Sequence, residues 1–284
     1  MSPSSRESKI RGISKPLRNI KLALEYDGTD FNGWQIQAKG HRTVQGEIEK
    51  AIKKISPPSA GGWRDLATLR VADKIKLYGS GRTDAGVHAL GQVANFKTQS
   101  RLTTDSIRKA LNANLPSDIT IVKVEEVPLD FHSQYSAKRK TYRYTILNRS
   151  SRPACQRQFC LHFPYKLDFK ILREEAKSLV GRRDFRSFGS LDKGESRENT
   201  VRHITKVEIK KKGDYLTIDI QANGFLYKMV RNIVGTLLDV AAGRLPPGSI
   251  KKILAQKNRK FASSPAPAHG LCLLKVKYQG ERLS

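Results

Sequence analysis

The hydrophobic positions of the first half of the chain predict two helices placed among four strands. Apolar residues occupy every second position from 20 to 26, with polar or small residues between them, which is the period of a half-buried strand. From Thr43, apolar residues recur at helical spacing until Ser56-Pro57-Pro58 ends the run. The same patterns then predict strands at 75–79, 92–98 and 119–127, with a second helix at 104–114.

The second half repeats this order. The patterns predict a strand at 142–146, helices at 169–179, 226–241 and 250–255, a hairpin of 204–209 with 216–220, and a last strand at 272–278. The order β-α-β-β-α-β is typical of a ferredoxin-like (RRM-like) unit, in which two helices cover one face of an antiparallel sheet. We therefore predict an α+β fold with two such halves, 18–130 and 131–284, a disordered basic tail at 1–17, and an insertion at 57–74.

The charge of the chain indicates a polyanionic partner. Lysine and arginine total 53 against 26 acidic residues, a formal net charge of +27. Such an excess repels itself in a compact chain and is best understood as an electrostatic footprint for phosphates, so nucleic acid is the leading partner. A lysine-rich surface that serves solubility is the alternative. No membrane association is expected, since no run approaches the roughly 18 apolar residues of a spanning helix.

Cysteine usage and the N-terminus indicate a reducing compartment. The three cysteines are odd in number and too few to staple a chain of this length, which favours the cytoplasm. Zinc ligands are conceivable in Cys155, Cys160, His162 and Cys272, but their spacing lacks the close pairs that structural zinc favours, so no metal site is predicted. The first residues lack an apolar segment and are not a secretory signal; an organellar transit segment is the alternative.

The strongest candidate for chemistry is the glycine-rich loop at 79–88, Gly-Ser-Gly-Arg-Thr-Asp-Ala-Gly-Val-His. It follows a predicted strand directly, where loops commonly present functional groups. Its arginine, Arg82, favours the ionised form of the carboxylate of Asp84, which suits a nucleophile or a base. The alternative is structural, because aspartate often hydrogen-bonds the backbone of its own turn.

Two further segments carry candidate functional residues. Tyr142 and Tyr144 alternate with basic residues on a predicted strand, a pattern found where bases stack and phosphates are neutralised, although alternating aromatics are more often core. Arg231 lies within an apolar helix and needs an anionic partner if it is buried; an arginine that reaches the surface is the alternative. Gly235, one turn later, indicates close approach of another backbone or a ligand.

Taken together, these motifs resemble the tRNA pseudouridine synthase A (TruA) family. They run in family order from about residue 20 to 278. The most specific of them is the glycine-rich loop that carries Asp84, which we call the aspartate loop. The matching blocks are Tyr26-Asp27-Gly28-Thr29, Gly33-Trp34-Gln35, Arg42-Thr43-Val44-Gln45, Gly81 to Ala89, Asn112-Ala113-Asn114-Leu115-Pro116, Phe131-His132, Tyr142-Arg143-Tyr144 and Met229 to Gly235. The basic tail, the insertion at 57–74 and Ser133-Gln134-Tyr135 depart from the pattern.

The resemblance implies isomerisation of uridine to pseudouridine at positions 38, 39 and 40 in the anticodon arm of tRNA, without metal or cofactor. It implies that Asp84 is the nucleophile, that Arg82 helps to expel the target base, that Tyr142 packs on the uracil, and that Arg231 pairs with Asp84. Asp84 would add to the uracil ring, attack C1′ or remove a sugar proton, and the residues do not choose among these routes. The family also has a continuous sheet with the site in a central cleft, and acts as a homodimer.

Two other functions compete with this interpretation. A non-catalytic RNA-binding protein would suit the charge and the RRM-like topology, but the strand at 92–98 carries one aromatic, Phe96, where an RRM needs an aromatic block. A metal-dependent nuclease would need clustered carboxylates, whereas the neighbourhood of Asp84 in sequence is basic. His88 and His132 have no catalytic partner nearby in sequence, so we predict hydrogen-bonded structural roles for both.

Overall fold

The computed structural model describes residues 16–38, 40–55, 76–190 and 199–280. Nearly all of the predicted tail at 1–17 and the whole insertion at 57–74 lie outside the described residues.

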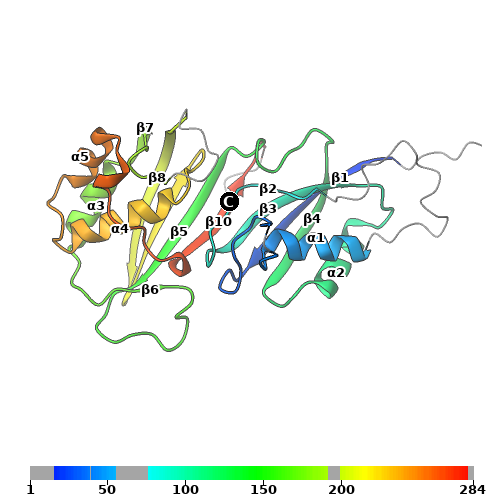
Figure 1. The fold of residues 1–284 in the computed structure, drawn as a ribbon, viewed down its shortest axis with the longest axis horizontal. Coiled ribbons are helices and arrows are strands. Elements are labelled where there is room, and N and C mark those ends of the chain that lie inside the picture. The colour runs from blue at the N-terminus through cyan, green and yellow to red at the C-terminus, as the bar shows by residue number, and fades with distance from the viewer. Residues whose placement is uncertain (1–15, 39, 56–75, 191–198, 281–284) are drawn as a thin grey trace, which may run out of the picture.

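The described strands form one large, mainly antiparallel sheet of ten strands, in the order β4-β1-β3-β10-β5-β9-β8-β7 (Figure 1). Two short strands join at the side, β2 on β3 and β6 on β5. The α+β class predicted from sequence is therefore confirmed. The strands are β1 Arg18–Tyr26, β2 Tyr78–Gly79, β3 His88–Thr98, β4 Ile119–Val127, β5 Arg139–Leu147, β6 Leu161–His162, β7 Gly181–Asp184, β8 Val201–Lys212, β9 Tyr215–Ala222 and β10 Leu271–Lys277.

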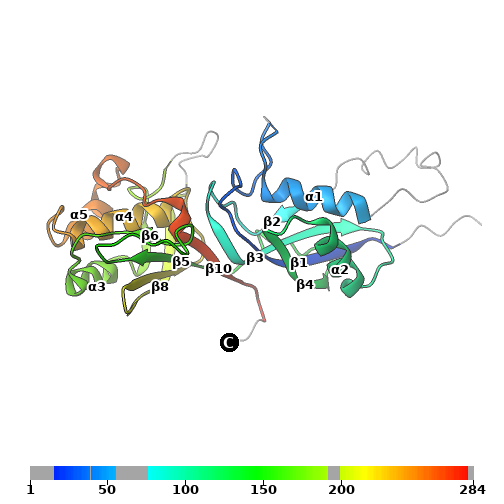
Figure 2. The ribbon, with the colours of Figure 1, turned by 90° about the horizontal axis from the view of Figure 1, so that it is seen from below.

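Five α-helices accompany the described part of the sheet: α1 Val44–Ile55, α2 Thr104–Asn114, α3 Phe169–Lys177, α4 Met229–Ala241 and α5 Ser249–Gln256. Helix α1 packs on α2, and α3 packs on α4. In Figure 2, α1 and α4 lie on the same side of the strands, one in each half. The N-termini of α2 and α3 are capped by Thr103 and Asp168, whose side chains accept backbone N–H groups that the helix leaves unpaired.

The alternation seen in the sequence decides which face of the sheet is buried. In β1, Ile20, Leu22 and Leu24 are fully buried, and the residues that alternate with them, Lys21, Ala23 and Glu25, are partly exposed. In β9, Leu216, Ile218 and Ile220 repeat the pattern. One face of the sheet is therefore apolar and covered, and the other is polar, as a two-residue period requires. No helix in the described part of the chain is long and apolar enough to cross a membrane.

The two halves meet at β10, the last strand of the chain. It pairs in parallel with the start of β3 through Cys272 and Leu273, and antiparallel with β5 along its length (Figure 1). This pairing explains why β3 begins at His88 rather than at the predicted position 92: its first residues bond to β10, a partner that no local pattern reveals.

The start of helix α4 and several short elements also differ from the predictions. Helix α4 begins at Met229 rather than 226, because Lys228 has a left-handed backbone, φ +56°, which a helix interior does not accept. Strands β6 and β7 and the 3₁₀ turns Arg259–Phe261 and Ala268–Gly270 were not predicted, since elements of two to four residues are too short to show a period.

Candidate active site

A cleft of about 1110 Å³ receives side chains from both halves of the chain. The N-terminal half contributes the segment before α1 and the loop between β2 and β3, and the C-terminal half contributes β5 and the start of α4. All four candidate residues from the sequence line this cleft: Arg82, Asp84, Tyr142 and Arg231.

The aspartate loop is held by backbone contacts with the segment that follows β1. Trp34 N–H donates to the carbonyl of Thr83 at 3.1 Å, and the Thr83 hydroxyl is 2.8 Å from the Tyr26 hydroxyl. Gly33 has φ +88°, and a Cβ placed on it would lie 2.5 Å from the Thr83 carbonyl oxygen. Only glycine permits both this backbone conformation and this approach. After Asp84, the Gly86 N–H donates to the Phe31 carbonyl at 3.3 Å, so the loop is fixed on either side of Asp84.

Asp84 is paired with Arg231 across the cleft. Arg231 Nη1 donates to Asp84 Oδ2 at 2.7 Å, and the two side chains are 14% and 17% exposed, respectively. The other carboxylate oxygen, Oδ1, has no hydrogen-bond partner among the described residues. The structural alternative for Asp84, a bond to its own turn, is not what the structure contains. Arg231 therefore holds one carboxylate oxygen of Asp84, and the other oxygen is available to a ligand in the cleft.

The Arg231 guanidinium is itself oriented by the backbone. Its Nε donates to the Ala266 carbonyl at 2.7 Å, and the Arg231 carbonyl accepts from Ala266 N–H at 3.0 Å. The segment carrying Ala266 lies directly on α4, where a Cβ at Gly235 would collide with the Ser264 carbonyl. The close backbone approach predicted at Gly235 is thus confirmed, and it positions the group that holds Asp84.

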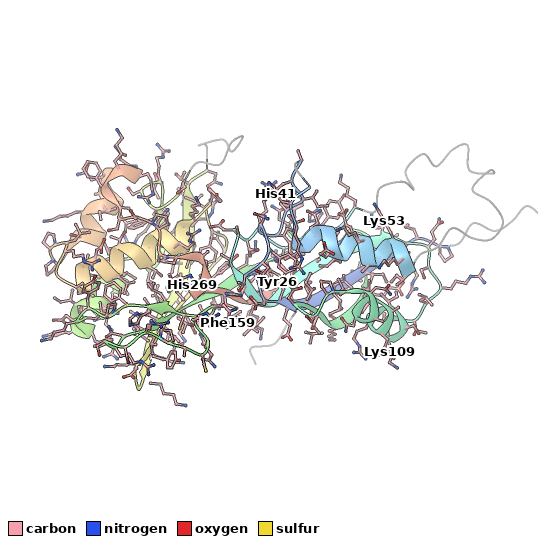
Figure 3. All side chains as sticks on the ribbon, turned by 60° about the horizontal axis from the view of Figure 1, so that its bottom comes forward. Tyr26, His41, Lys53, Lys109, Phe159 and His269 are labelled. Atoms are coloured by element: carbon pink, nitrogen blue, oxygen red, sulfur yellow. The ribbon has the colours of Figure 1, made fainter. Side chains whose placement is uncertain are left out.

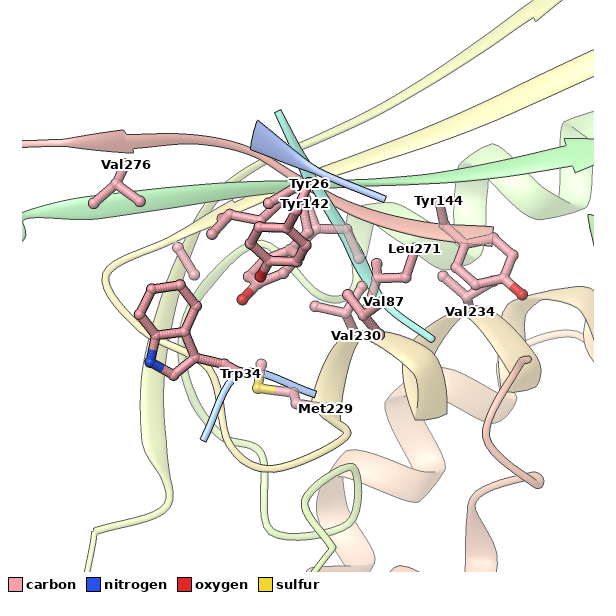
Figure 4. Packing of buried hydrophobic residues seen from close by; sticks show 14 of the residues in the cluster. Tyr26, Trp34, Val87, Tyr142, Tyr144, Met229, Val230, Val234, Leu271 and Val276 are labelled. Carbon is pink, nitrogen blue, oxygen red and sulfur yellow. The ribbon is translucent and has the colours of Figure 1, made fainter. Parts of the chain in front are cut away.

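Tyr142 forms part of the cleft wall and part of the core. Its side chain is 7% exposed and packs edge-on against Phe225, with ring centroids 5.1 Å apart. Figure 4 shows it in the buried cluster with Tyr26, Trp34 and Met229. Its hydroxyl has no hydrogen-bond partner among the described residues. Burial, and secondarily the charges around it, raise the pKa of Tyr142, so the phenol stays protonated at neutral pH.

Arg82 differs from the other three candidates because it is exposed. It lies two residues before Asp84, lines the cleft, and makes no hydrogen bond or ion pair with the described residues. An arginine without an internal partner at the mouth of a cleft is available for an anionic ligand.

Comparisons with known proteins show which family the chain belongs to. The sequence matches a family described as tRNA pseudouridine synthase over residues 22–136 and 176–279. It is 44% identical over 262 residues to the tRNA pseudouridine synthase A of Caldicellulosiruptor bescii, covering 92% of this chain and 100% of that protein. It is 41% identical over 266 residues to that of Geobacillus kaustophilus, covering 94% and 96%. The chain belongs to the tRNA pseudouridine synthase A family.

This family membership confirms the resemblance seen in the sequence, and the activity is that of a tRNA pseudouridine synthase, an isomerase. A solved structure of a Cbf5-Nop10-Gar1 complex aligns with 89% of this chain and 57% of its own chain, at 12% identity. Its TM-score of 0.34 is too low to indicate a shared fold.

A partly buried cation in the cleft of this synthase was not foreseen from the sequence. Lys140, in β5, donates from Nζ to the Ser80 carbonyl at 2.5 Å, and so holds the start of the aspartate loop. Burial, and to a smaller extent the guanidinium of Arg202, lower the pKa of Lys140 to about 8. The sequence showed Lys140 only as one of several cations around Tyr142, because nothing local distinguishes a buried lysine from an exposed one.

The lowered pKa of Lys140 should make the free energy of unfolding depend on pH. The unfolded chain titrates Lys140 near its ordinary value of 10.5, above the folded value of about 8. Between these values the unfolded state binds more protons, so the contribution of Lys140 to stability rises with pH. From about pH 7.5 to 9.5 the wild type should gain about 2 kcal/mol of unfolding free energy relative to Lys140→Met. Urea unfolding of both proteins measures this; equal pH dependence would contradict it.

The glycine contact of the aspartate loop gives a second prediction. Gly33→Ala must both strain a positive φ and push against the Thr83 carbonyl, so we expect a loss of about 3 kcal/mol in stability and a marked loss of activity. Gly40→Ala is the matched control, because Gly40 has φ +69° but nothing within 4 Å of its added Cβ. It should cost about 1 kcal/mol and leave activity unchanged. Equal effects of the two substitutions in urea unfolding and tritium-release assays would contradict a specific role for the close contact between Gly33 and the Thr83 carbonyl.

His88 and His132 are both hydrogen-bonded, as predicted from the sequence. His88 is buried, its Nδ1 accepts from Gly28 N–H at 3.0 Å, and its Nε2 lies 2.8 Å from the Gln158 carbonyl. Its ring also contacts Phe159, which Figure 3 places near the middle of the molecule. His132 accepts from Gln134 N–H at 3.2 Å through Nδ1.

The cysteines do not assemble into a metal site in the described part of the chain. All three are free; Cys155 is exposed and Cys160 is buried. His162 Nε2 lies 2.9 Å from the Arg149 carbonyl. Among the described residues, no group of three or more histidine, cysteine or acidic side chains is arranged to hold a metal ion.

Proposed function

We propose that this synthase converts uridine to pseudouridine at positions 38, 39 and 40 in the anticodon arm of tRNA, with Asp84 as the nucleophile. The supporting observation is a carboxylate anchored through one oxygen by an internal guanidinium, with its second oxygen available in a cleft. Such a group is oriented and can react without reorganisation. A formal net charge of +27 suits an RNA substrate.

The reaction needs no net change in oxidation state. The N1–C1′ bond of the uridine breaks, the uracil turns while it is held, and C5 bonds to C1′. The proton on C5 leaves, and N1 ends with a proton, so the product is an isomer of the substrate. Asp84 serves this sequence by adding to the ring, by attacking C1′, or by removing a sugar proton.

Arg82 and Tyr142 take complementary roles in this proposal. Arg82, exposed at the cleft, contacts the RNA backbone and helps to displace the target base, whose unstacking carries a cost. Tyr142 packs on the uracil, and its raised pKa keeps the hydroxyl available as a hydrogen-bond donor. Arg231 holds the Asp84 carboxylate in place in the cleft through its hydrogen bond.

The proposed architecture is consistent with these separate roles of the cleft residues. We infer two ferredoxin-like units, 18–130 and 131–284, joined through β10, with the helices on one face and the cleft between them. The protein acts as a homodimer in the cytoplasm, without metal or cofactor. Sedimentation equilibrium tests the dimer; a monomer mass at micromolar concentration would contradict it.

Mapping pseudouridine in an unmodified tRNA after incubation with the protein tests the function. We expect modification confined to positions 38, 39 and 40, and equal in the presence of a chelator. A protein that binds tRNA tightly and leaves every uridine unchanged would be the non-catalytic RNA-binding alternative. Loss of activity on chelation, restored by zinc, would show that a metal is required.

A further inference from the structure

Three aromatic rings contact one another in a row at the cleft. The ring centroids of Tyr78 and His132 are 4.5 Å apart and those of His132 and Tyr135 are 4.4 Å apart, with the ring planes tilted by 52° and 33°. All three residues line the same cleft as Asp84. Tyr135 is 79% exposed, so the outer end of the stack faces solvent. We call these three residues the aromatic stack.

The segment carrying the stack is held firmly although its last ring is exposed. Ser133 is fully buried; its hydroxyl donates to the Tyr78 carbonyl at 2.6 Å, and its backbone N–H donates to Asn95 at 2.9 Å. The Tyr278 hydroxyl donates to the Ser133 carbonyl at 2.7 Å. On the other side of His132, Asn19 Nδ2 donates to the Phe131 carbonyl at 2.9 Å. Because the backbone on both sides of His132 is fixed, this segment loses little further conformational entropy when a ligand stacks on Tyr135.

The chemistry of the stack favours a flat, uncharged ligand group. Burial lowers the pKa of His132, so the central ring is neutral at pH 7 and does not act as a phosphate-binding cation. A cation is nevertheless close by, since Lys76 Nζ lies 5.4 Å from the centre of the Tyr78 ring. Aromatic faces beside a basic residue are the arrangement by which proteins hold unpaired nucleotides.

We propose that the aromatic stack binds a nucleobase of the substrate RNA other than the reacting uridine, with Tyr135 in face-to-face contact. The inference rests on the proposed function, since it assumes an RNA in the cleft. A cleft of about 1110 Å³ exceeds the usual size of a small-molecule site, which leaves room for more than one nucleotide. Stacking on Tyr135 holds an unpaired neighbour of the target and tolerates any base, because every base has a π-face.

Binding of an anticodon-arm hairpin that carries 2-aminopurine at one loop position at a time tests this proposal. Stacking quenches the emission of 2-aminopurine, so one position should be quenched by the wild type. Tyr135→Ala should remove that quenching and raise Kd by roughly 5- to 150-fold. Tyr135→Phe should restore both. Tyr165→Ala is the matched control, because Tyr165 is 57% exposed and lies outside the cleft lining; it should bind as the wild type does.

The outcomes separate this proposal from the proposed function. If the wild type forms pseudouridine but Tyr135→Ala binds the hairpin as tightly as the wild type, the stacking site is wrong and the function stands. If Tyr135→Leu restores Kd as fully as phenylalanine does, an apolar contact replaces stacking and the proposal fails. Absence of pseudouridine with the wild type would contradict the function itself. The expected loss lies in Kd and KM, and kcat at saturating RNA should change far less.

Discussion

Replacing Asp84 with asparagine is expected to reduce pseudouridine formation by at least about 10³-fold while tRNA binding changes by only a few-fold. Asparagine keeps the shape of the side chain and still accepts a hydrogen bond from Arg231, which lies 2.7 Å from the carboxylate. A neutral amide, however, is neither a nucleophile nor a base at the free oxygen. Release of tritium from C5-labelled uridine in tRNA measures the rate, because the C5 proton leaves as the new glycosidic bond is completed.

Asp219→Asn is the matched control for this experiment. Asp219 also pairs with an arginine, Arg143, through two hydrogen bonds of 2.7 Å, but neither residue lines the cleft. Its substitution tests whether loss of any arginine–aspartate pair in the sheet impairs the enzyme. We expect near-normal turnover in this variant. If Asp84→Asn formed pseudouridine at the wild-type rate, Asp84 would not take part in the chemical step.

Binding of tRNA is expected to weaken by about 10³-fold or more between about 50 and 200 mM salt. The reason is the release of counterions when lysine and arginine neutralise phosphates, and the chain has a formal net charge of +27. A plot of log K against log salt concentration should be linear. Filter binding or fluorescence anisotropy across this salt range measures the slope.

Single substitutions assign part of that slope to the cleft. Arg82→Gln should reduce its magnitude by about 0.9, because one phosphate contact is lost. Lys177→Gln, on α3 and away from the cleft lining, should leave the slope unchanged. A flat salt dependence of the wild type would show that the basic excess does not serve RNA binding.

Local pattern was a good guide to the elements that are amphipathic over many residues. Strand β1, with apolar residues at every second position from 20 to 26, and helix α2 at Thr104–Asn114 were predicted closely. The errors fall where a tertiary contact sets the boundary. Strand β3 starts four residues early because β10 pairs with His88, and α4 starts three residues late because of the backbone at Lys228.

In the candidate site, too, local sequence predicted some features and chain packing decided the others. Asp84, Arg82, Tyr142 and Arg231 were all singled out from their local sequence, and the structure places all four along one cleft. The partial burial of Lys140 and its lowered pKa were not foreseen, because both depend on the residues that surround Lys140 in space and not on its neighbours in sequence. Nor was the aromatic stack, since Tyr78 and Tyr135 come from separate segments of the chain.

By itself the sequence determined the α+β class and the order of the longer elements, and it indicated a polyanionic partner and Asp84 as the candidate for the reactive carboxylate, because period, charge and motif are local properties. Only the tertiary structure decided that β10 joins the halves and that the Arg231 guanidinium, held by the Ala266 carbonyl, anchors one oxygen of Asp84. Asp84 and Arg231 are 147 residues apart in the chain. Their pairing depends on chain packing, in which a close backbone approach at Gly235 sets the position of a charge.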